Sequence, residues 1–245
     1  MRKFGLIGKD ISYSFSQNYF TLKFKDENIK DTTYQNFDLQ TIKDFKNQVL
    51  KTDHLAGLNV TIPYKESIIP FLDSLDKKAK KIGAVNTIKF TKKGNLKGYN
   101  TDIYGFKKSI KPHLKKQHKK ALILGTGGAS KAIAFVLKEL NIKYSFVSRQ
   151  ASNKANYTYD TLTEDIISKH QIIINCSPVG TFPNVDDAPN IPYKGITSKH
   201  ILFDLIYNPS ETLFLKQGKN KGAVILNGYN MLVFQAEKSW KIWNK

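Results

Sequence analysis

A glycine-rich turn between a strand and a helix is the first stretch of the sequence that could do chemistry. The apolar run Ala121 to Leu124 leads directly into it, and an apolar stripe at helical spacing and a second apolar run, Tyr144 to Val147, follow it. In this strand–turn–helix–strand context, glycines allow a tight turn and a close approach to a pyrophosphate at a helix N-terminus. An ordinary glycine turn is the alternative. We predict that a dinucleotide contacts the residues of the turn: Gly125, Thr126, Gly127, Gly128, Ala129 and Ser130.

The end of the second strand indicates which dinucleotide is bound. Proteins that prefer NAD place Asp or Glu there to hold the ribose 2′-hydroxyl. This chain has Ser148 and Arg149 instead, with Lys154 shortly after. A guanidinium can grip a 2′-phosphate with two hydrogen bonds, whereas a carboxylate would repel it. The sequence therefore predicts NADP rather than NAD, although Arg149 could also be an ordinary surface cation.

Polar residues cluster where apolar runs end in the first hundred residues. The clusters are Ser14-Phe15-Ser16, residues 59–65 (NVTIPYK), Asn86-Thr87 and Asn100-Thr101-Asp102. Ligands of α/β proteins bind at the carboxyl ends of strands. Hydroxyls, amides, one lysine and one aspartate suit a small polyhydroxylated carboxylate. The five histidines lack paired-ligand spacing, so we expect no metal site.

The elements that must position these residues alternate between strand and helix, which predicts an α/β protein. We expect a first domain over residues 1–101, a Rossmann-type nucleotide domain over residues 102–228, and a C-terminal helix within residues 229–245 that packs back on the first domain. In the first domain we expect strands at 4–8, 33–37, 54–62 and 83–88. We expect one helix capped by Ser16, one at 42–49, one at 65–72 that is broken at Pro70, and a further helix that runs to Lys81. In the second we expect strands at 121–124, 144–147, 171–176, 201–205 and 223–226, with helices after the glycine turn and at 211–218.

The composition is that of a globular protein with a strong basic excess. The chain has 245 residues, a single cysteine (Cys176) and a formal net charge of +19. Lysines are spread along the whole chain, so we favour a diffuse solvated surface over a nucleic-acid partner; a basic nucleic-acid-binding protein remains the alternative. The N-terminus does not read as a signal peptide, no apolar run reaches the ~20 residues of a membrane span, and cysteine is scarce. These features predict a cytoplasmic protein without membrane association.

Taken together, the motifs resemble those of the shikimate dehydrogenase family along nearly the whole chain. The matching stretches are Tyr13 to Ser16, Gly57 to Lys65 (GLNVTIPYK), Gly83 to Thr87 (GAVNT), Gly98 to Phe106 (GYNTDIYGF), the glycine turn, and Asp204 to Pro209 (DLIYNP). The Asn-Val-Thr-x-Pro-x-Lys and Asn-Thr-Asp-x-x-Gly motifs carry most of the specificity. The resemblance implies a substrate domain and an NADP domain with the active site in the cleft between them. It also implies NADP-dependent, reversible reduction of 3-dehydroshikimate to shikimate in chorismate and aromatic amino-acid biosynthesis.

The resemblance also implies roles for individual residues. Lys65 and Asp102 correspond to the catalytic pair: Lys65 can supply a proton and positive charge to a developing alkoxide, and Asp102 can bind the same hydroxyl and hold the ammonium. Either Lys65 alone or the pair of Lys65 and Asp102 would transfer the proton. Leu205 and Gly228 would flank the nicotinamide. The residues implied to bind the carboxylate or ring hydroxyls of the substrate are Ser14, Ser16, Thr61, Asn86, Tyr207 and Gln235.

Two other readings of the same motifs stay open. The chain could be a relative that acts on quinate with NAD or either cofactor, although Thr61 and the absence of an acid after the second nucleotide strand favour shikimate and NADP. It could also be a non-catalytic ligand-binding protein on the same fold, against which the presence of both Lys65 and Asp102 argues. The expected partner is a small-molecule substrate, and the protein could be a monomer or a homodimer.

Overall fold

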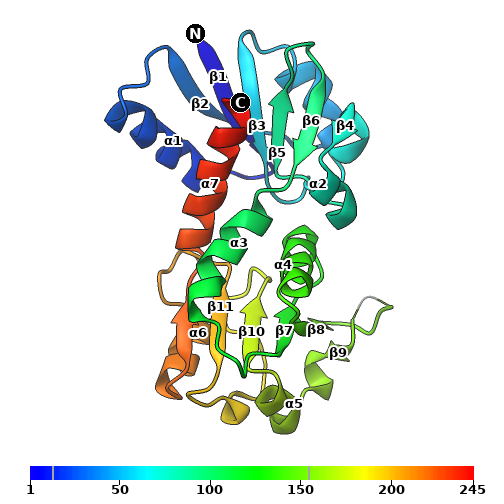
Figure 1. The fold of residues 1–245 in the computed structure, drawn as a ribbon, viewed down its shortest axis with the longest axis vertical. Coiled ribbons are helices and arrows are strands. Elements are labelled where there is room, and N and C mark those ends of the chain that lie inside the picture. The colour runs from blue at the N-terminus through cyan, green and yellow to red at the C-terminus, as the bar shows by residue number, and fades with distance from the viewer. Residues whose placement is uncertain (13, 154) are drawn as a thin grey trace. The chain divides into compact units, whose positions relative to one another are not determined.

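The computed structural model describes residues 1–12, 14–153 and 155–245, and the chain divides into two compact units (Figure 1). Unit 1 comprises residues 1–101 and 235–245, and unit 2 comprises residues 102–234. Each unit has a six-stranded sheet with helices packed on it. The predicted α/β class is therefore confirmed, and each unit is described separately.

Unit 1 is built on a mixed sheet with the strand order β2-β1-β3-β5-β6-β4. β1 is parallel to β2 and β3, whereas β5 is antiparallel to β3 and β6. The helices are α1 (Phe15–Asp26), α2 (Lys77–Ile82) and the C-terminal part of α7 (Tyr229–Trp243). The strands are β1 (Arg2–Gly8), β2 (Thr32–Asp38), β3 (Leu55–Val60), β4 (Ser74–Leu75), β5 (Thr87–Phe90) and β6 (Leu96–Tyr99).

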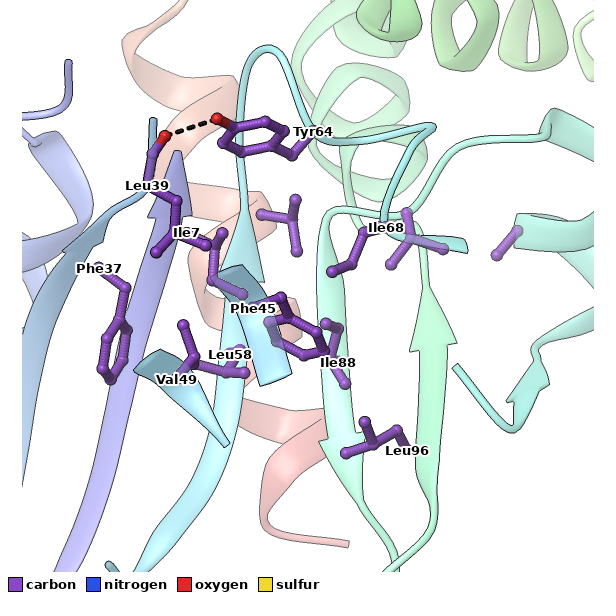
Figure 2. Packing of buried hydrophobic residues seen from close by; sticks show 13 residues of the cluster. Ile7, Phe37, Leu39, Phe45, Val49, Leu58, Tyr64, Ile68, Ile88 and Leu96 are labelled. Carbon is purple, nitrogen blue, oxygen red and sulfur yellow. Dashed lines mark hydrogen bonds between the residues drawn. The ribbon is translucent and has the colours of Figure 1, made fainter. Parts of the chain in front are cut away.

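The two faces of this sheet bury two separate apolar clusters, because side chains alternate along each strand. Ile7 points to one face, where it joins Phe45, Leu58 and Ile88 (Figure 2). Tyr64 belongs to the same cluster, and its hydroxyl group donates a hydrogen bond to the carbonyl of Leu39 at 2.5 Å. On the other face, β1 meets α1 and α7 through an aromatic cluster formed by Phe4, Phe20, Phe24, Tyr34, Trp240 and Trp243.

Unit 2 is a parallel, doubly wound sheet with the strand order β12-β11-β10-β7-β8-β9. β8 and β9 extend the sheet on one side of β7, and β10, β11 and β12 extend it on the other side. The direction in which successive strands are added therefore reverses at β7. That point is where ligands bind in open parallel sheets. The strands are β7 (Lys120–Leu124), β8 (Lys143–Ser148), β9 (Tyr157–Thr158), β10 (Ile172–Asn175), β11 (Ile201–Asp204) and β12 (Val224–Leu226). The helices are α3 (Asp102–Ile110), α4 (Gly128–Glu139), α5 (Glu164–Lys169), α6 (Leu213–Asn220) and the first part of α7.

Several local predictions in unit 1 were wrong, and each has a local cause. Ser14, not Ser16, caps α1: its backbone is extended and its Oγ accepts the N–H of Gln17 at 3.2 Å. Residues 42–49 form a short 3-10 helix followed by a π-helical turn, although Phe45 and Val49 are still buried. Residues 65–68 form turns instead of the expected helix, and a short 3-10 helix over Ile69–Phe71 follows at the position of the expected break, Pro70.

Strand boundaries and short elements account for the remaining differences. The strand expected over 83–88 starts only at Thr87, because Gly83 takes a left-handed conformation that closes α2. The strands β4, β6 and β9 and the helix α5 were not predicted; β4 and β9 have two residues each and α5 has six. Such short elements carry too few residues for a periodic pattern. Within the described part of the chain, no helix has both the length and the apolar character to cross a bilayer.

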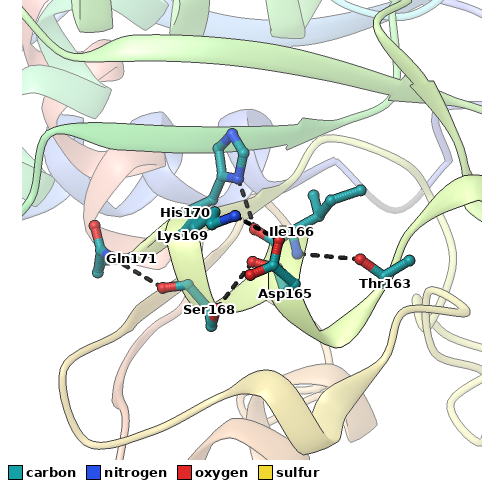
Figure 3. A network of polar contacts seen from close by, with 7 residues as sticks. All are labelled: Thr163, Asp165, Ile166, Ser168, Lys169, His170 and Gln171. Carbon is teal, nitrogen blue, oxygen red and sulfur yellow. Dashed lines mark hydrogen bonds and ion pairs between the residues drawn. The ribbon is translucent and has the colours of Figure 1, made fainter.

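Two of the buried histidines of unit 2, His118 and His170, lie just before the neighbouring strands β7 and β10. Nδ1 of His118 accepts the N–H of Lys115 at 2.8 Å, so the proton lies on Nε2, which faces the carbonyl of Lys199 at 3.1 Å. Nδ1 of His170 lies 2.7 Å from the carbonyl of Ile166 (Figure 3). Burial lowers the pKa of both rings, the carbonyl contacts oppose it, and nearby Lys115 and Lys120 lower it further.

We expect these histidines to make unit 2 less stable as the pH falls from about 7.5 to about 5.5. Their pKa values are lower in the folded chain than in the unfolded chain, so the unfolded chain takes up protons first. His118→Asn and His170→Asn keep a hydrogen-bonding group at the position of Nδ1 but do not titrate. The measurement is the free energy of unfolding in urea across this pH range. The double variant should show a shallower pH dependence than the parent, by up to about two protons; equal slopes would contradict the prediction.

Candidate functional site

The predicted substrate residues of unit 1 come from separate elements. Ser14 caps α1 and Ser16 lies in its first turn, both buried. Thr61 follows β3 directly, and its N–H donates to the carbonyl of Ile7 at 2.8 Å. Asn86 precedes β5, and Gln235 is on α7. Gln235 is buried and is the first residue that α7 contributes to unit 1.

Lys65 is held next to Asn86 by the backbone. It is half-buried in the turn that follows β3, and its carbonyl accepts the N–H of Val85 at 2.7 Å. Asn86, the next residue, is tied in turn to the following motif: its N–H donates to Tyr99 at 3.0 Å, and its Oδ1 accepts the N–H of Thr101 at 2.7 Å. The three motifs around Lys65, Asn86 and Thr101 are thus joined inside unit 1. Asp102 follows Thr101 in the chain, begins α3 and is buried.

A buried hydrogen-bond network, which the sequence did not reveal, lies beneath Asn86 and Gln235. Asn59 donates from Nδ2 to the carbonyl of Asn86 at 3.1 Å and to Ser239 Oγ at 3.0 Å, and its Oδ1 accepts the hydroxyl proton of Tyr34 at 2.9 Å. Burial raises the pKa of Tyr34, and a hydrogen bond with Ser16 opposes that shift. The network extends from the α1 cap to α7. The only signal for Ser239 in the sequence is its position four residues after Gln235, one turn later on the same helix face.

The glycine turn of unit 2 has the geometry of a phosphate-binding loop. It follows β7 at the point where the strand order reverses, and Gly125 takes a φ of +110° that favours glycine. Gly127 is the N-cap of α4 and no side chain caps the helix there, so its first N–H groups are not used by a capping side chain. A Cβ on Gly127 would meet no atom within 4 Å. Packing within the protein therefore does not require a glycine at this position.

The next strand ends in the predicted 2′-phosphate region. Ser148 is the last residue of β8, and its hydroxyl donates to the carbonyl of Gln150. Arg149 follows it and is exposed. Lys154 lies outside the described residues. With a cation and no carboxylate directly after β8, the residues present fit NADP.

The two residues predicted to flank the nicotinamide are in contact. A Cβ on Gly228 would lie only 2.1 Å from the carbonyl oxygen of Leu205, and the Gly228 N–H donates to the carbonyl of Ile206 at 2.9 Å. The loop after β11 therefore packs directly against the segment that leads into α7. Tyr207 lies half-buried in the same loop, where burial raises its pKa.

Asp204, the last residue of β11, anchors this loop and was not singled out as a site residue from the sequence. Its carboxylate accepts the Thr212 hydroxyl proton at 2.7 Å, the Ile206 N–H at 3.0 Å and Nδ2 of Asn175 at 3.1 Å. Burial raises the pKa of Asp204 to about 6, and the three hydrogen bonds oppose that shift. Asn175 also accepts the N–H and the hydroxyl proton of Ser177. Asp204 therefore joins the loops that follow β10 and β11.

Comparison with known proteins gives the same family from sequence and from structure. The family model described as the shikimate dehydrogenase substrate binding domain matches residues 6–88. The shikimate dehydrogenase (NADP(+)) of Methanosphaera stadtmanae is 40% identical over 257 residues, covering 98% of this chain and 90% of that protein.

Solved structures agree with the sequence match. The shikimate dehydrogenase of Aquifex aeolicus has a TM-score of 0.88 at 34% identity, covering 100% of this chain and 92% of that one. The enzyme of Thermus thermophilus, in complex with NADP(H) and shikimate, has a TM-score of 0.87 at 26% identity, covering 99% and 93%. The resemblance drawn from the motifs is confirmed. The chain belongs to the shikimate dehydrogenase family.

Proposed function

We propose that this protein is an NADP-dependent shikimate dehydrogenase that catalyses the reversible reduction of 3-dehydroshikimate to shikimate in the biosynthesis of chorismate and aromatic amino acids. The observation that carries the proposal is the backbone link between the Lys65 turn and Asn86, which brings a lysine beside a buried array of amides and hydroxyls. Such an array suits a polyhydroxylated carboxylate, and the named relatives act on shikimate with NADP.

Lys65 moves the proton in the proposed mechanism. When shikimate is oxidised, the hydroxyl proton passes to the Lys65 amine; when 3-dehydroshikimate is reduced, the ammonium returns a proton to the developing alkoxide. The nicotinamide of NADP supplies or accepts the hydride. Asp102, the first residue of α3, is the second member of the proposed catalytic pair.

The substrate is recognised by donors that the fold has already oriented. Ser14 Oγ accepts the N–H of Gln17, so its own proton can be given to the substrate carboxylate. The Ser16 hydroxyl is the second donor proposed for that carboxylate. Thr61, Asn86, Tyr207 and Gln235 are proposed to bind the carboxylate or the ring hydroxyls.

The glycine turn and the end of β8 are proposed to hold the cofactor. The N–H groups at the start of α4 suit the pyrophosphate, and the open space beside Gly127 allows it to approach. Ser148, Arg149 and Lys154 are proposed to contact the 2′-phosphate, and Leu205 and Gly228 to flank the nicotinamide.

An assay that crosses two substrates with two cofactors tests the proposed function. Purified protein is given shikimate or quinate with NADP or NAD, and reduced cofactor is followed by its absorbance. The highest kcat/KM is expected for shikimate with NADP. A higher value with quinate would reassign the substrate, and the absence of turnover with saturable shikimate binding would indicate a non-catalytic binding protein.

We expect Arg149→Ala to raise the KM for NADP by roughly 10- to 100-fold and to leave the KM for NAD within about twofold. The variant removes charge-assisted hydrogen bonds to a group that only NADP carries, and such bonds contribute ~1.5–3 kcal/mol. Steady-state kinetics with both cofactors measure the effect. Lys143→Ala is the matched control, because Lys143 is an exposed cation at the other end of β8. An equal loss with NADP and NAD in Arg149→Ala would contradict the assignment.

The wider setting of the protein is also part of the proposal. We propose that it acts in the cytoplasm as a monomer or homodimer without a nucleic-acid partner, and that its +19 charge attracts the anionic substrate and cofactor. Light scattering coupled to gel filtration gives the oligomeric state. Salt-sensitive binding to duplex DNA at micromolar concentration or below would contradict the absence of a nucleic-acid partner.

A further inference from the structure

Asn175 is a fully buried amide at the end of β10, a strand that is otherwise apolar. The three residues before it are isoleucines, and all four residues are 0% exposed. A buried amide is costly unless hydrogen bonds in the protein replace those it made to water. Its neighbours across the sheet are Leu124 at the end of β7 and Asp204 at the end of β11. The contacts of Asn175 therefore have to explain why this strand ends on a polar side chain.

The amide of Asn175 has two protons and two lone pairs, and all four are used within the protein. Its Oδ1 accepts the N–H of Ser177 at 3.0 Å and the Ser177 hydroxyl proton at 2.6 Å. Its Nδ2 donates to the carbonyl of Val179 at 3.3 Å and to Asp204 Oδ1 at 3.1 Å. A backbone N–H can only donate and a carbonyl can only accept, so the amide has one possible orientation. In that orientation it fixes the start of the loop after β10.

Asn175 also reaches the loop after β11, through its backbone and through Asp204. Its carbonyl accepts the N–H of Leu205 at 3.0 Å. The Asp204 oxygen that accepts from Asn175 also accepts the Ile206 N–H at 3.0 Å, and the other oxygen accepts the Thr212 hydroxyl proton at 2.7 Å. One residue thus connects the first residues of two loops that follow neighbouring strands.

Both loops belong to the part of unit 2 that is proposed to hold the cofactor. A Cβ on Gly125 would lie 3.4 Å from the carbonyl carbon of Cys176 and 3.5 Å from the backbone nitrogen of Ser177, so the glycine turn lies directly against the loop after β10. The loop after β11 carries Leu205 and Tyr207, which are proposed to contact the nicotinamide and the substrate. Asn175 therefore lies between the turn proposed for the pyrophosphate and the loop proposed for the nicotinamide.

We infer that Asn175 is a positioning residue of the cofactor site, which holds the loops after β10 and β11 together beside the glycine turn. The inference rests on the proposed function and deepens it by naming a residue that sets the position of the nicotinamide. Asn175 acts through the loops, because its own hydrogen bonds are all made within the protein. An apolar side chain of similar size would fill the same space and leave both loops without this connection.

Asn175→Leu tests the inference by separating the two halves of the cofactor. The kcat for shikimate oxidation with NADP is expected to fall about 10- to 100-fold, because a small displacement of reacting groups is costly. Adenosine 2′,5′-bisphosphate lacks the nicotinamide half, and its Kd should stay within about twofold because helix N–H groups still meet its phosphate. Steady-state kinetics and calorimetric titration measure the two effects. Ser177→Ala removes one of the four hydrogen bonds and should lower kcat about two- to tenfold. It provides the test if Asn175→Leu does not fold.

Thr163→Val is the matched control for a general loss of stability in unit 2. Thr163 is the N-cap of α5, outside both loops, and its Oγ1 accepts the N–H of Ile166 at 3.2 Å. This variant should lower the melting temperature and leave kcat unchanged. The inference is overturned if folded Asn175→Leu and Ser177→Ala keep the parental kcat, or if Thr163→Val lowers kcat as much as Ser177→Ala does. It is also overturned if Asn175→Leu weakens adenosine 2′,5′-bisphosphate as much as it lowers kcat.

A second measurement separates this inference from the proposed function. If the parent protein shows no shikimate-dependent turnover, the proposed function fails, but the connection between the loops can still be observed. Amide hydrogen exchange of Ser177 and Ile206 is followed by ¹H–¹⁵N NMR in the free protein. Both amides should exchange at least about fivefold faster in Asn175→Leu, because both loops open more easily, and neither should change in Thr163→Val. Parental exchange of Ile206 in Asn175→Leu would show that Asn175 does not hold the two loops together and would overturn the inference.

Discussion

Lys65→Met is expected to lower kcat for shikimate oxidation about 10³-fold and to leave NADP binding within about twofold. The variant keeps the length of the side chain but removes the only group proposed to accept the hydroxyl proton, and general acid–base catalysis contributes 10²–10⁴-fold. The Lys65 backbone carbonyl, which accepts the Val85 N–H, is untouched, so the turn beside Asn86 should persist. Stopped-flow and steady-state kinetics give kcat, and fluorescence titration gives the affinity for NADP.

A surface lysine distinguishes loss of catalysis from a general effect of replacing a lysine. Lys80→Met is the matched control, because Lys80 is an exposed lysine on α2 and should keep full activity. If folded Lys65→Met keeps more than about a tenth of the parental kcat, Lys65 does not transfer the proton and the proposed mechanism is wrong.

The nucleotide half of the molecule could be predicted closely because its signals are local. The strand, glycine turn and helix from Lys120 to Glu139 are contiguous in the sequence, and the apolar periodicity changes from strand to helix within a few residues. The elements missed among the described residues of this unit are short: β9, α5 and the 3-10 helices over Lys111–His113, Tyr159–Thr161 and Tyr193–Gly195.

Unit 1 was harder to predict because much of its structure is irregular. The residues after β3 carry the predicted lysine but form turns and a 3-10 helix. The helix predicted over residues 65–72 would have placed Lys65 in a regular first turn. The structure holds it instead through the hydrogen bond from Val85, twenty residues later. A contact of that kind leaves no periodic trace in the sequence.

The supporting residues of the site depend on contacts between segments that are far apart in the chain. Ser239 reaches Asn59, which is 180 positions away, and the sequence gives no sign of that pairing. Asp204 could be read from the sequence as part of a motif, but its three hydrogen bonds and its raised pKa of about 6 appear only when β10 and β11 lie side by side. Motifs therefore predicted the residues proposed to meet ligands, whereas the residues that orient them required the fold.

Gly228→Ala is expected to destabilise the protein by about 3 kcal/mol or more and to abolish turnover. The added Cβ would lie 2.1 Å from the carbonyl oxygen of Leu205, 2.6 Å from its carbonyl carbon and 3.2 Å from the carbonyl oxygen of Ile206. These are backbone atoms, which cannot rotate away as a side chain can. Overpacking costs 1–3 kcal/mol where side chains can adjust. Here either the loop after β11 or the start of α7 must move, and Leu205 and Tyr207 would move with that loop. Urea unfolding and steady-state kinetics measure the two effects.

Gly127→Ala provides the contrast that separates a glycine needed by the fold from a glycine needed by a ligand. Its Cβ would meet no protein atom within 4 Å, and its backbone, with φ −78° and ψ −174°, is open to any residue. The variant should lose no more than about 1 kcal/mol of stability, the cost of alanine at an N-cap. Its KM for NADP should nevertheless rise at least about tenfold, because the methyl group occupies the space proposed for the phosphate.

If Gly228→Ala is as stable as the parent, the loop can move freely and the close packing of Leu205 on Gly228 does not define the site. If Gly127→Ala binds NADP normally, the phosphate does not approach the turn at this residue.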